Sequence, residues 1–527
     1  MPNVYEGMTA TELGIHSAGV ASLVAFGKVF SLIVGGMTFI IVARLLGPNS
    51  YGVYILAVGV AGFLGAFGSL SLSQYMNRRI PELIIKKEEK KVSEIIGVAL
   101  VLMLAISTII TFIGLIFAEP IATLVFHNPN GGFVVDIALT SIIVSMIYGT
   151  LYAILVSFGD GKDAALSSVT NNSIQAIVSI GLILLGFGAL GAVSGWILGL
   201  LCGLIFELFA LKLNCKANIV FHNFRMHAKE MLSFSLPITG SSIIGGLVSN
   251  FGVLYIGMLF LPGAVGLYGM ASKIGVYLDL IIGSIGIVLI PMFSVAMASN
   301  AIKKRLEGFY NYSIYFGLLF ATPLVIYLAI FSNSIIISVF TSTYYSGSIY
   351  MALIGIGILL GLIGSYASSL VISAGMIKKV FEYAVVTGVV ELAFMLALTP
   401  AMGILGVIIS LYFVGGILSD YLYVMLVKNS LGIKVKPKVF RLTFANLVLI
   451  GVLLPLAISG IKPTYQLIAG FVAVIFVYPM FLGLTKAIGS KELNLLKGIS
   501  DKIPLFGTWI NAILVYAGLF VRETDGL

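Results

Sequence analysis

Four ionisable side chains lie inside long apolar runs of the sequence, where few charges are tolerated. Lys28 falls near the middle of the first run, Lys273 and Asp279 lie in the eighth, and Glu391 lies in the eleventh. A charge near the centre of a bilayer costs about 2.5–3.5 kcal/mol on insertion scales, so it is retained where it faces a wet cavity or a partner. A lysine suits a phosphate group, and a carboxylate suits a proton, a cation or a lysine.

Arg44 ends the first of these runs, where a charge either reaches the membrane surface or serves a site. It belongs to the turn Ala43–Tyr54, in which Pro48 and Gly52 are predicted to end one helix and start the next. A degenerate copy of this turn, Leu261–Tyr268, follows 214 residues later. Two copies of one helix–turn–helix signature indicate a duplicated bundle of helices.

The elements that must position these side chains are membrane helices. Of the 527 residues, 59% are hydrophobic and only 10% are charged, whereas a soluble domain has about 25% charged residues. A helix needs about 20 apolar residues to cross a bilayer. Fourteen runs are predicted to do so, near residues 17–43, 52–75, 93–118, 133–158, 165–187, 189–211, 231–260, 264–292, 308–332, 347–373, 379–400, 402–427, 440–460 and 464–485.

The basic residues gather in alternate loops between these runs. These loops and the tail hold 26 of the 30 lysines and arginines, and the opposite loops hold only Arg44 and Lys462. Because cytoplasmic loops carry the excess of basic residues, this pattern predicts that both termini are cytoplasmic. The apolar stretch 507–521 is short for a crossing and is predicted to be an interfacial helix. The alternative is a fifteenth span, which would place the C-terminus outside.

The turn Ala43–Tyr54 and the following stretch Ser69–Arg79 resemble a signature of the polysaccharide biosynthesis membrane proteins. This is the O-antigen-type flippase family of the multidrug/oligosaccharidyl-lipid/polysaccharide (MOP) exporter superfamily. The signature has an Ala-Arg-x-Leu-Gly-Pro turn, then Tyr-Gly, then a small-residue helix that ends near an arginine. The second-repeat signature is matched by Leu236-Pro237, Val265–Tyr268, Ala271 and Pro291. Many members also carry an acid late in the seventh span, which Asn250–Gly257 lacks.

The resemblance covers about residues 12–430 and implies an all-α, polytopic fold. Two six-helix lobes, related by pseudo-two-fold symmetry, would surround a central cavity and open alternately to each side, as parallel repeats do. The predicted division is an N-terminal lobe over 1–220 and a C-terminal lobe over 221–430. Spans thirteen and fourteen occupy 431–490, and a cytoplasmic or interfacial tail occupies 491–527.

In the resembling family the first and eighth spans line the cavity, where basic residues engage a lipid diphosphate. This implies that Lys28, Lys273 and Arg44 bind the substrate. The competing interpretation is a structural salt bridge, for example between Lys28 and Glu391 or Asp279, and an interfacial anchor for Arg44. Asp279 and Glu391 are candidates for ion coupling or for charge partners. Lys273 and Asp279 lie about 600° apart around one helix, so they are poor partners for each other.

Three further acids, Glu207, Glu382 and Asp420, lie near the inner ends of their spans. We expect them to be solvated or paired with loop lysines. The four histidines show no ligand spacing, so neither a metal site nor another cofactor is expected. No residues are assigned a catalytic role, and Gly159–Lys162 lacks the spacing of a phosphate-binding loop.

The leading hypothesis is a flippase, not an enzyme, that moves a polyisoprenyl-diphosphate-linked oligosaccharide from the cytoplasmic to the outer leaflet of the cell membrane. Its expected partners are this substrate and membrane lipids, with no nucleic acid, and it is expected to be a monomer. No ATPase domain is evident, so an ion gradient, the membrane potential or the substrate gradient would drive transport. An ion-coupled drug exporter of the same superfamily is the alternative. A membrane glycosyltransferase or polymerase is disfavoured by the short predicted outer loops.

Overall fold

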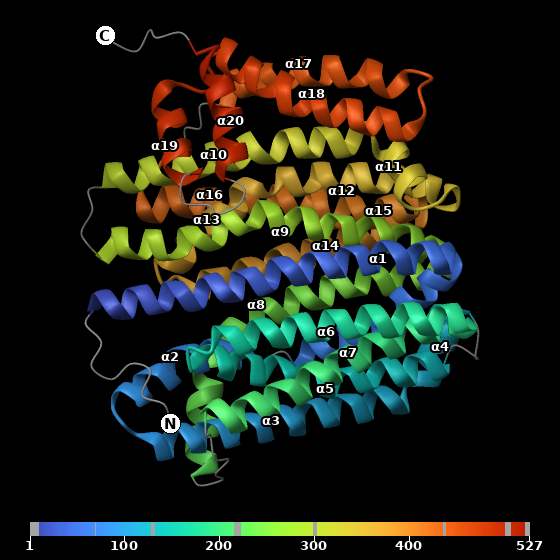
Figure 1. Ribbon diagram of the computed structural model, residues 1–527. Coiled ribbons are helices and arrows are strands. Elements are labelled where there is room, and N and C mark those ends of the chain that lie inside the picture. The colour runs from blue at the N-terminus through green and yellow to red at the C-terminus, as the bar shows by residue number, and fades with distance from the viewer. Residues whose placement is uncertain are drawn as a thin grey trace. The chain divides into compact units, whose positions relative to one another are not determined.

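The computed structural model describes residues 10–68, 70–127, 132–215, 223–298, 303–435, 439–500 and 507–521, in which every regular element is a helix (Figure 1). The α-helices are α1 (Ala10–Gly68), α2 (Leu72–Ile85), α3 (Glu89–Ile116), α4 (Ala118–Phe126), α5 (Gly132–Ser157), α6 (Gly161–Leu182), α7 (Gly188–Ala210), α8 (Phe224–Leu259), α9 (Pro262–Ala298), α10 (Lys303–Ile330), α11 (Ser332–Val339), α12 (Ser348–Leu360), α13 (Leu362–Ser373), α14 (Ile377–Met402), α15 (Ile404–Ile408), α16 (Gly415–Leu431), α17 (Val439–Ile458), α18 (Pro463–Leu484), α19 (Ser490–Ser500) and α20 (Gly507–Gly518). The all-α prediction is therefore confirmed.

Twelve helices of the described residues are long and apolar enough to cross a membrane. Two of them far exceed the ~20 residues that one crossing needs. Gly27–Gly68 has 42 residues, and Gly161–Leu213 has 53. Each of these two helices covers two of the predicted spans. The chain is a multi-pass membrane protein, and the count of fourteen crossings stays a prediction.

The first long helix folds back on itself at Gly47. This glycine has φ 66° and ψ 172°, a conformation that residues with a side chain rarely adopt. The rings of Phe39 and Tyr51 lie 6.2 Å apart, whereas twelve residues of a straight helix would separate them by about 18 Å. The chain therefore reverses at the predicted boundary, but the pivot is Gly47 rather than Pro48 or Gly52.

The second long element is a hairpin of α6 and α7, which lie side by side in Figure 1. The reversal contains Gly186 at φ 93° and Gly188 at φ 53°. Behind it the two helices approach so closely that a Cβ on Gly195 would press on the backbone of Ser179. Small residues of this kind allow membrane helices to pack at short distance.

The helices group into two compact units. The first contains Met1–Gly269 and Ile377–Val407, and the second contains Met270–Met376 and Ile408–Leu527. Helix α8 joins the first unit because it packs on α1 and α3, and α14 joins because it packs on α8. The predicted lobe boundary near residue 220 is not tested by this grouping and stays a prediction.

The apolar stretch predicted to be an interfacial helix contains α20, which packs against α18 and α19. The ring of Tyr516 in α20 lies 5.8 Å from the ring of Phe476 in α18. With 12 residues, α20 is shorter than a membrane crossing requires. Its place at a membrane surface stays a prediction.

Candidate functional site

Lys28 lies on α1 with its side chain exposed, although the helix around it is apolar. The residue before it, Gly27, is buried where α1 packs on Ala165 of α6. Glu391 lies half-buried on α14 of the same unit. Among the described residues, no ion pair joins Lys28 to Glu391 or to any other acid. The ammonium group of Lys28 is therefore exposed and has no acidic partner within the described residues.

Lys273 is likewise exposed on α9, within the second unit. It follows Ala271, which is fully buried, and a Cβ on Gly275 would press on Ile354 of α12. Asp279 is exposed about one and two-thirds turns further along α9, and the described residues contain no ion pair between it and Lys273. The helix is therefore fixed by its small residues while its two charged side chains remain available.

Arg44 is exposed in the last turn of α1 before the reversal at Gly47. Directly after it, the two copies of the turn signature pack against each other within the first unit. A Cβ on Gly52 would press on the carbonyl oxygen of Pro262, and a Cβ on Gly266 would press on that of Pro48. The signature glycines thus allow two backbones to meet, and this is a structural role.

Replacing Gly52 with alanine is expected to lower the free energy of unfolding by about 1–3 kcal/mol, because the added methyl group overpacks a rigid backbone contact. Gly65→Ala is the matched control, since a Cβ at Gly65 meets nothing within 4 Å and alanine favours a helix. Chemical denaturation of the purified protein in detergent measures both. Equal stability of the two variants would contradict the packing role.

Glu207 departs from the expectation of a solvated or lysine-paired acid. Its side chain is 0% exposed, and its Oε1 accepts a hydrogen bond of 2.8 Å from Ser167 Oγ on α6. Asp420 also lacks a lysine partner among the described residues, and its Oδ1 accepts the backbone N–H of Gly364 at 2.5 Å. Only Glu382 behaves as expected, with Lys379 Nζ 2.6 Å away.

A pair of buried ionisable side chains joins α3 to the beginning of α8. His227 Nε2 lies 3.0 Å from Glu94 Oε2, and both side chains are 4% exposed. The same part of α8 contacts α2, where Arg79 Nε lies 3.5 Å from Glu230 Oε1. The same helices also contribute apolar side chains to one buried cluster, so the first turns of α8 are held by both polar and apolar contacts.

Ion pairs at the surface of α2 neutralise part of the positive charge of this basic segment. Arg79 and Lys86 both hydrogen-bond to Glu82, at 2.9 and 2.6 Å. The hydrogen bond from Lys86 is the main cause that lowers the pKa of Glu82 to about 2, and the one from Arg79 adds to it. These three charges satisfy one another, so they are poor candidates for substrate binding.

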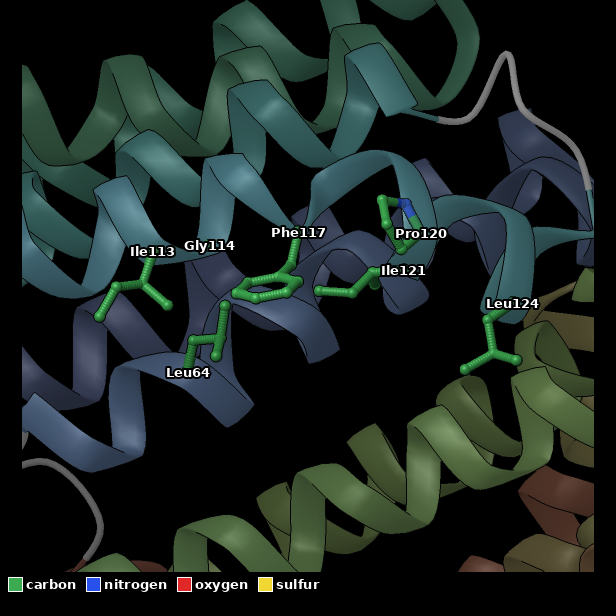
Figure 2. A pocket seen from close by; sticks show the side chains of 7 residues that line it. All are labelled: Leu64, Ile113, Gly114, Phe117, Pro120, Ile121 and Leu124. Carbon is green, nitrogen blue, oxygen red and sulfur yellow. The ribbon is translucent and has the colours of Figure 1, made fainter.

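An apolar pocket opens between α1, α3 and α4, with a volume of about 270 Å³. Figure 2 shows Phe117 and Ile121 facing Leu64 across it, and Pro120 and Leu124 extend its wall along α4. No charged side chain lines the pocket. It can accept hydrocarbon but offers nothing to a phosphate or a sugar.

Sequence reasoning named Glu207 but missed its burial, and it missed the Glu94–His227 pair. The described residues contain no group of three histidine, cysteine or acidic side chains suited to a metal ion. Among the described residues, no ion pair is formed by the candidate site residues Lys28, Arg44, Lys273, Asp279 or Glu391. By their chemistry, the lysines and the arginine can each bind an anionic group, and the two acids can each bind a proton or a cation.

Known proteins are similar to this chain in sequence and in fold. The family described as "polysaccharide biosynthesis protein" matches residues 41–349. Stage V sporulation protein B of Bacillus subtilis (strain 168) is 22% identical over 467 residues, which cover 82% of this chain and 87% of the relative. The succinoglycan biosynthesis transport protein ExoT of Rhizobium meliloti (strain 1021) is 28% identical over 156 residues, which cover 29% of this chain and 30% of the relative.

Solved structures with the same fold include the lipid II flippase MurJ in an inward closed conformation. Its TM-score is 0.72 at 17% identity, and the match covers 88% of this chain and 99% of that chain. An inward-facing multidrug resistance transporter of the MATE family, in the MOP superfamily, has a TM-score of 0.64 at 16% identity, with 76% and 94% covered. At these identities the likeness shows the fold alone.

Proposed function

Because the chain belongs to the polysaccharide biosynthesis protein family, within the MOP superfamily of flippases and transporters, we propose that it moves a polyisoprenyl-diphosphate-linked oligosaccharide from the cytoplasmic to the outer leaflet. A relative is named as a succinoglycan biosynthesis transport protein, and a structural neighbour as a lipid II flippase. Both names support a lipid-linked precursor of a glycan as the substrate. As a member of this family the chain is a transporter, not an enzyme.

The observation that carries the proposal is the exposed ammonium group of Lys28 on an apolar helix. A charge on such a helix is retained where it serves a site, and the described residues supply no acid to neutralise it. A lipid diphosphate carries about two negative charges at neutral pH, which the ammonium group of a lysine can bind; we propose the same role for Lys273. Arg44 would bind the headgroup while the substrate enters or leaves the binding site.

Transport would follow alternating access between two repeats. The cations take the diphosphate and the glycan follows into the cavity, while the isoprenoid tail stays in the bilayer. The basic loops favour cytoplasmic termini, so loading occurs from the cytoplasmic leaflet of the cell membrane. We place both termini on that side and propose that a monomer is sufficient.

Translocation of fluorescent probes into proteoliposomes tests the substrate class. We expect a polyisoprenyl-diphosphate sugar to cross at least about tenfold faster than the corresponding monophosphate, because one charge-assisted hydrogen bond contributes about 1.5–3 kcal/mol. A cationic dye should not be transported. Export of the dye, with no movement of the diphosphate probe, would instead support the drug-exporter alternative.

A further inference from the structure

We propose that Glu207 is an exchangeable proton-binding site, formed with Ser167 and Tyr148 between α5, α6 and α7. The proton resides on Glu207 Oε2, is taken from water when the carboxylate is protonated, and returns to water when the site opens. The existence of the site is independent of the flippase function, but its use to couple proton movement to flipping rests on that proposed function.

The first argument is the incomplete hydrogen bonding of a fully buried acid. Glu207 and Ser167 are both 0% exposed, and their side chains are joined through Oε1 at 2.8 Å. The other carboxyl oxygen, Oε2, is buried without any hydrogen-bond partner among the described residues. Burial without a partner costs an ionised carboxylate far more than it costs a neutral acid. A proton on Oε2 therefore lowers the cost of burying this side chain.

The second argument is the absence of a compensating cation in the described part of the site. The helices that pack against α7 are α1, α5 and α6. From Gly27 onwards, the ionisable side chains of these three helices are Lys28, Arg44, Tyr51, Tyr54, Asp136, Tyr148, Tyr152, Lys162 and Asp163. Lys28, Lys162 and Arg44 are exposed, as is Lys212 directly after α7, and no ion pair reaches Glu207 within the described residues. The neighbouring tyrosines carry no charge at neutral pH.

The third argument is that Glu207 lies within a polar cluster rather than alone. Ser167 Oγ is 3.4 Å from Tyr148 OH, and the buried Asn171 Oδ1 and Tyr152 OH also lack partners among the described residues. A Cβ on Gly203 would lie 2.8 Å from the Tyr148 ring. The glycine thus allows α5 and α6 to bring their polar groups against α7, one turn from Glu207. Hydroxyl groups can both accept and donate, so they can serve either protonation state.

The acid at the corresponding position of the second predicted repeat has different surroundings. This difference favours Glu207 as the proton-binding site. Asp420 lies 213 residues after Glu207 on α16, close to the 214-residue spacing of the turn signature. It is half-buried, and it accepts the N–H of Gly364, a donor that stabilises the ionised form. Glu207 is fully buried and bonded to a hydroxyl. A metal cation would need several further oxygen ligands, whereas a proton needs only Oε2.

Infrared difference spectroscopy of the full-length protein in detergent tests the site directly. We expect the purified protein at neutral pH to show a carbonyl band of a protonated carboxylic acid, shifted in D2O, that Glu207→Gln removes. Glu382→Gln is the matched control, because this acid is paired with Lys379 at the surface, and the band should persist. Ser167→Ala should shift the band to higher frequency by removing its hydrogen bond, which keeps the test available if Glu207→Gln misfolds.

A band that is unchanged in Glu207→Gln, or that Ser167→Ala does not shift, would overturn the proton site. If replacing choline chloride by sodium chloride removes the band from the wild-type protein, a sodium ion occupies the site in place of the proton. This result would also overturn the proton site.

Coupling is measured separately in proteoliposomes. An imposed pH gradient should change the initial flipping rate of the wild type but not of Glu207→Gln. If the pH gradient does not change the flipping rate of the wild type, coupling is refuted and the proton site is not. If the wild type does not flip the probe at all, the proposed function is refuted.

Discussion

Replacing Lys28 with alanine is expected to abolish translocation of a polyisoprenyl-diphosphate sugar while the protein still inserts and folds. The side chain is exposed and makes no ion pair among the described residues, so its removal leaves no buried acid uncompensated. The substrate, in contrast, loses a cation in a low-dielectric environment. Truncating one partner of such a charge pair costs about 2–5 kcal/mol, which is at least ~30-fold in affinity.

Lys28→Arg keeps the charge and should retain part of the activity, although arginine differs in shape from a compact ammonium group. Lys273→Ala is expected to lose translocation as Lys28→Ala does. Lys462→Ala is the matched control, because Lys462 is an exposed lysine before α18. This variant should translocate the substrate at the normal rate. Initial rates in proteoliposomes, at equal amounts of inserted protein, measure all four variants. Normal rates in both Lys28→Ala and Lys273→Ala would refute a cationic binding site.

Much of the architecture was predictable because it depends on local chemistry. Long apolar runs must become helices in a bilayer, where every backbone polar group needs a partner, and the glycine-rich turn at 43–54 marks a reversal. The position of the pivot at Gly47 was not predictable, since it depends on how the two halves of α1 pack after the turn. The same holds for Gly186 and Gly188 between α6 and α7.

The environment of the acids was not predictable from their positions in the chain. Glu207 and Glu382 both lie near the inner end of a predicted span, yet one is fully buried and the other is paired with Lys379. The difference arises from Gly199 and Gly203, which bring α7 against Asn171 and Tyr148 of neighbouring helices. Such burial is a tertiary property. The glycines one and two turns before Glu207 were the available signal, because small residues mark close helix contacts.

Glu94 and His227 illustrate the same limit over a longer distance. They are 133 residues apart, and only the docking of α8 on α3 brings them to 3.0 Å. Glu94→Ala is expected to lower the free energy of unfolding by about 1–3 kcal/mol, because it leaves the buried His227 ring without its hydrogen-bond partner. His227→Ala should have a similar effect. Chemical denaturation in mixed detergent micelles measures both.

A double-mutant cycle separates the pair from simple packing. If Glu94 and His227 stabilise each other, the double alanine variant should be less destabilised than the sum of the two single variants. Glu230→Ala is the matched control on the same part of α8, because its ion pair with Arg79 is 3.5 Å long and partly exposed, and such pairs contribute about 0–1 kcal/mol. Strict additivity of the Glu94 and His227 effects would show that α8 is held by its apolar side chains, such as Ala228 and Met231, and not by this pair.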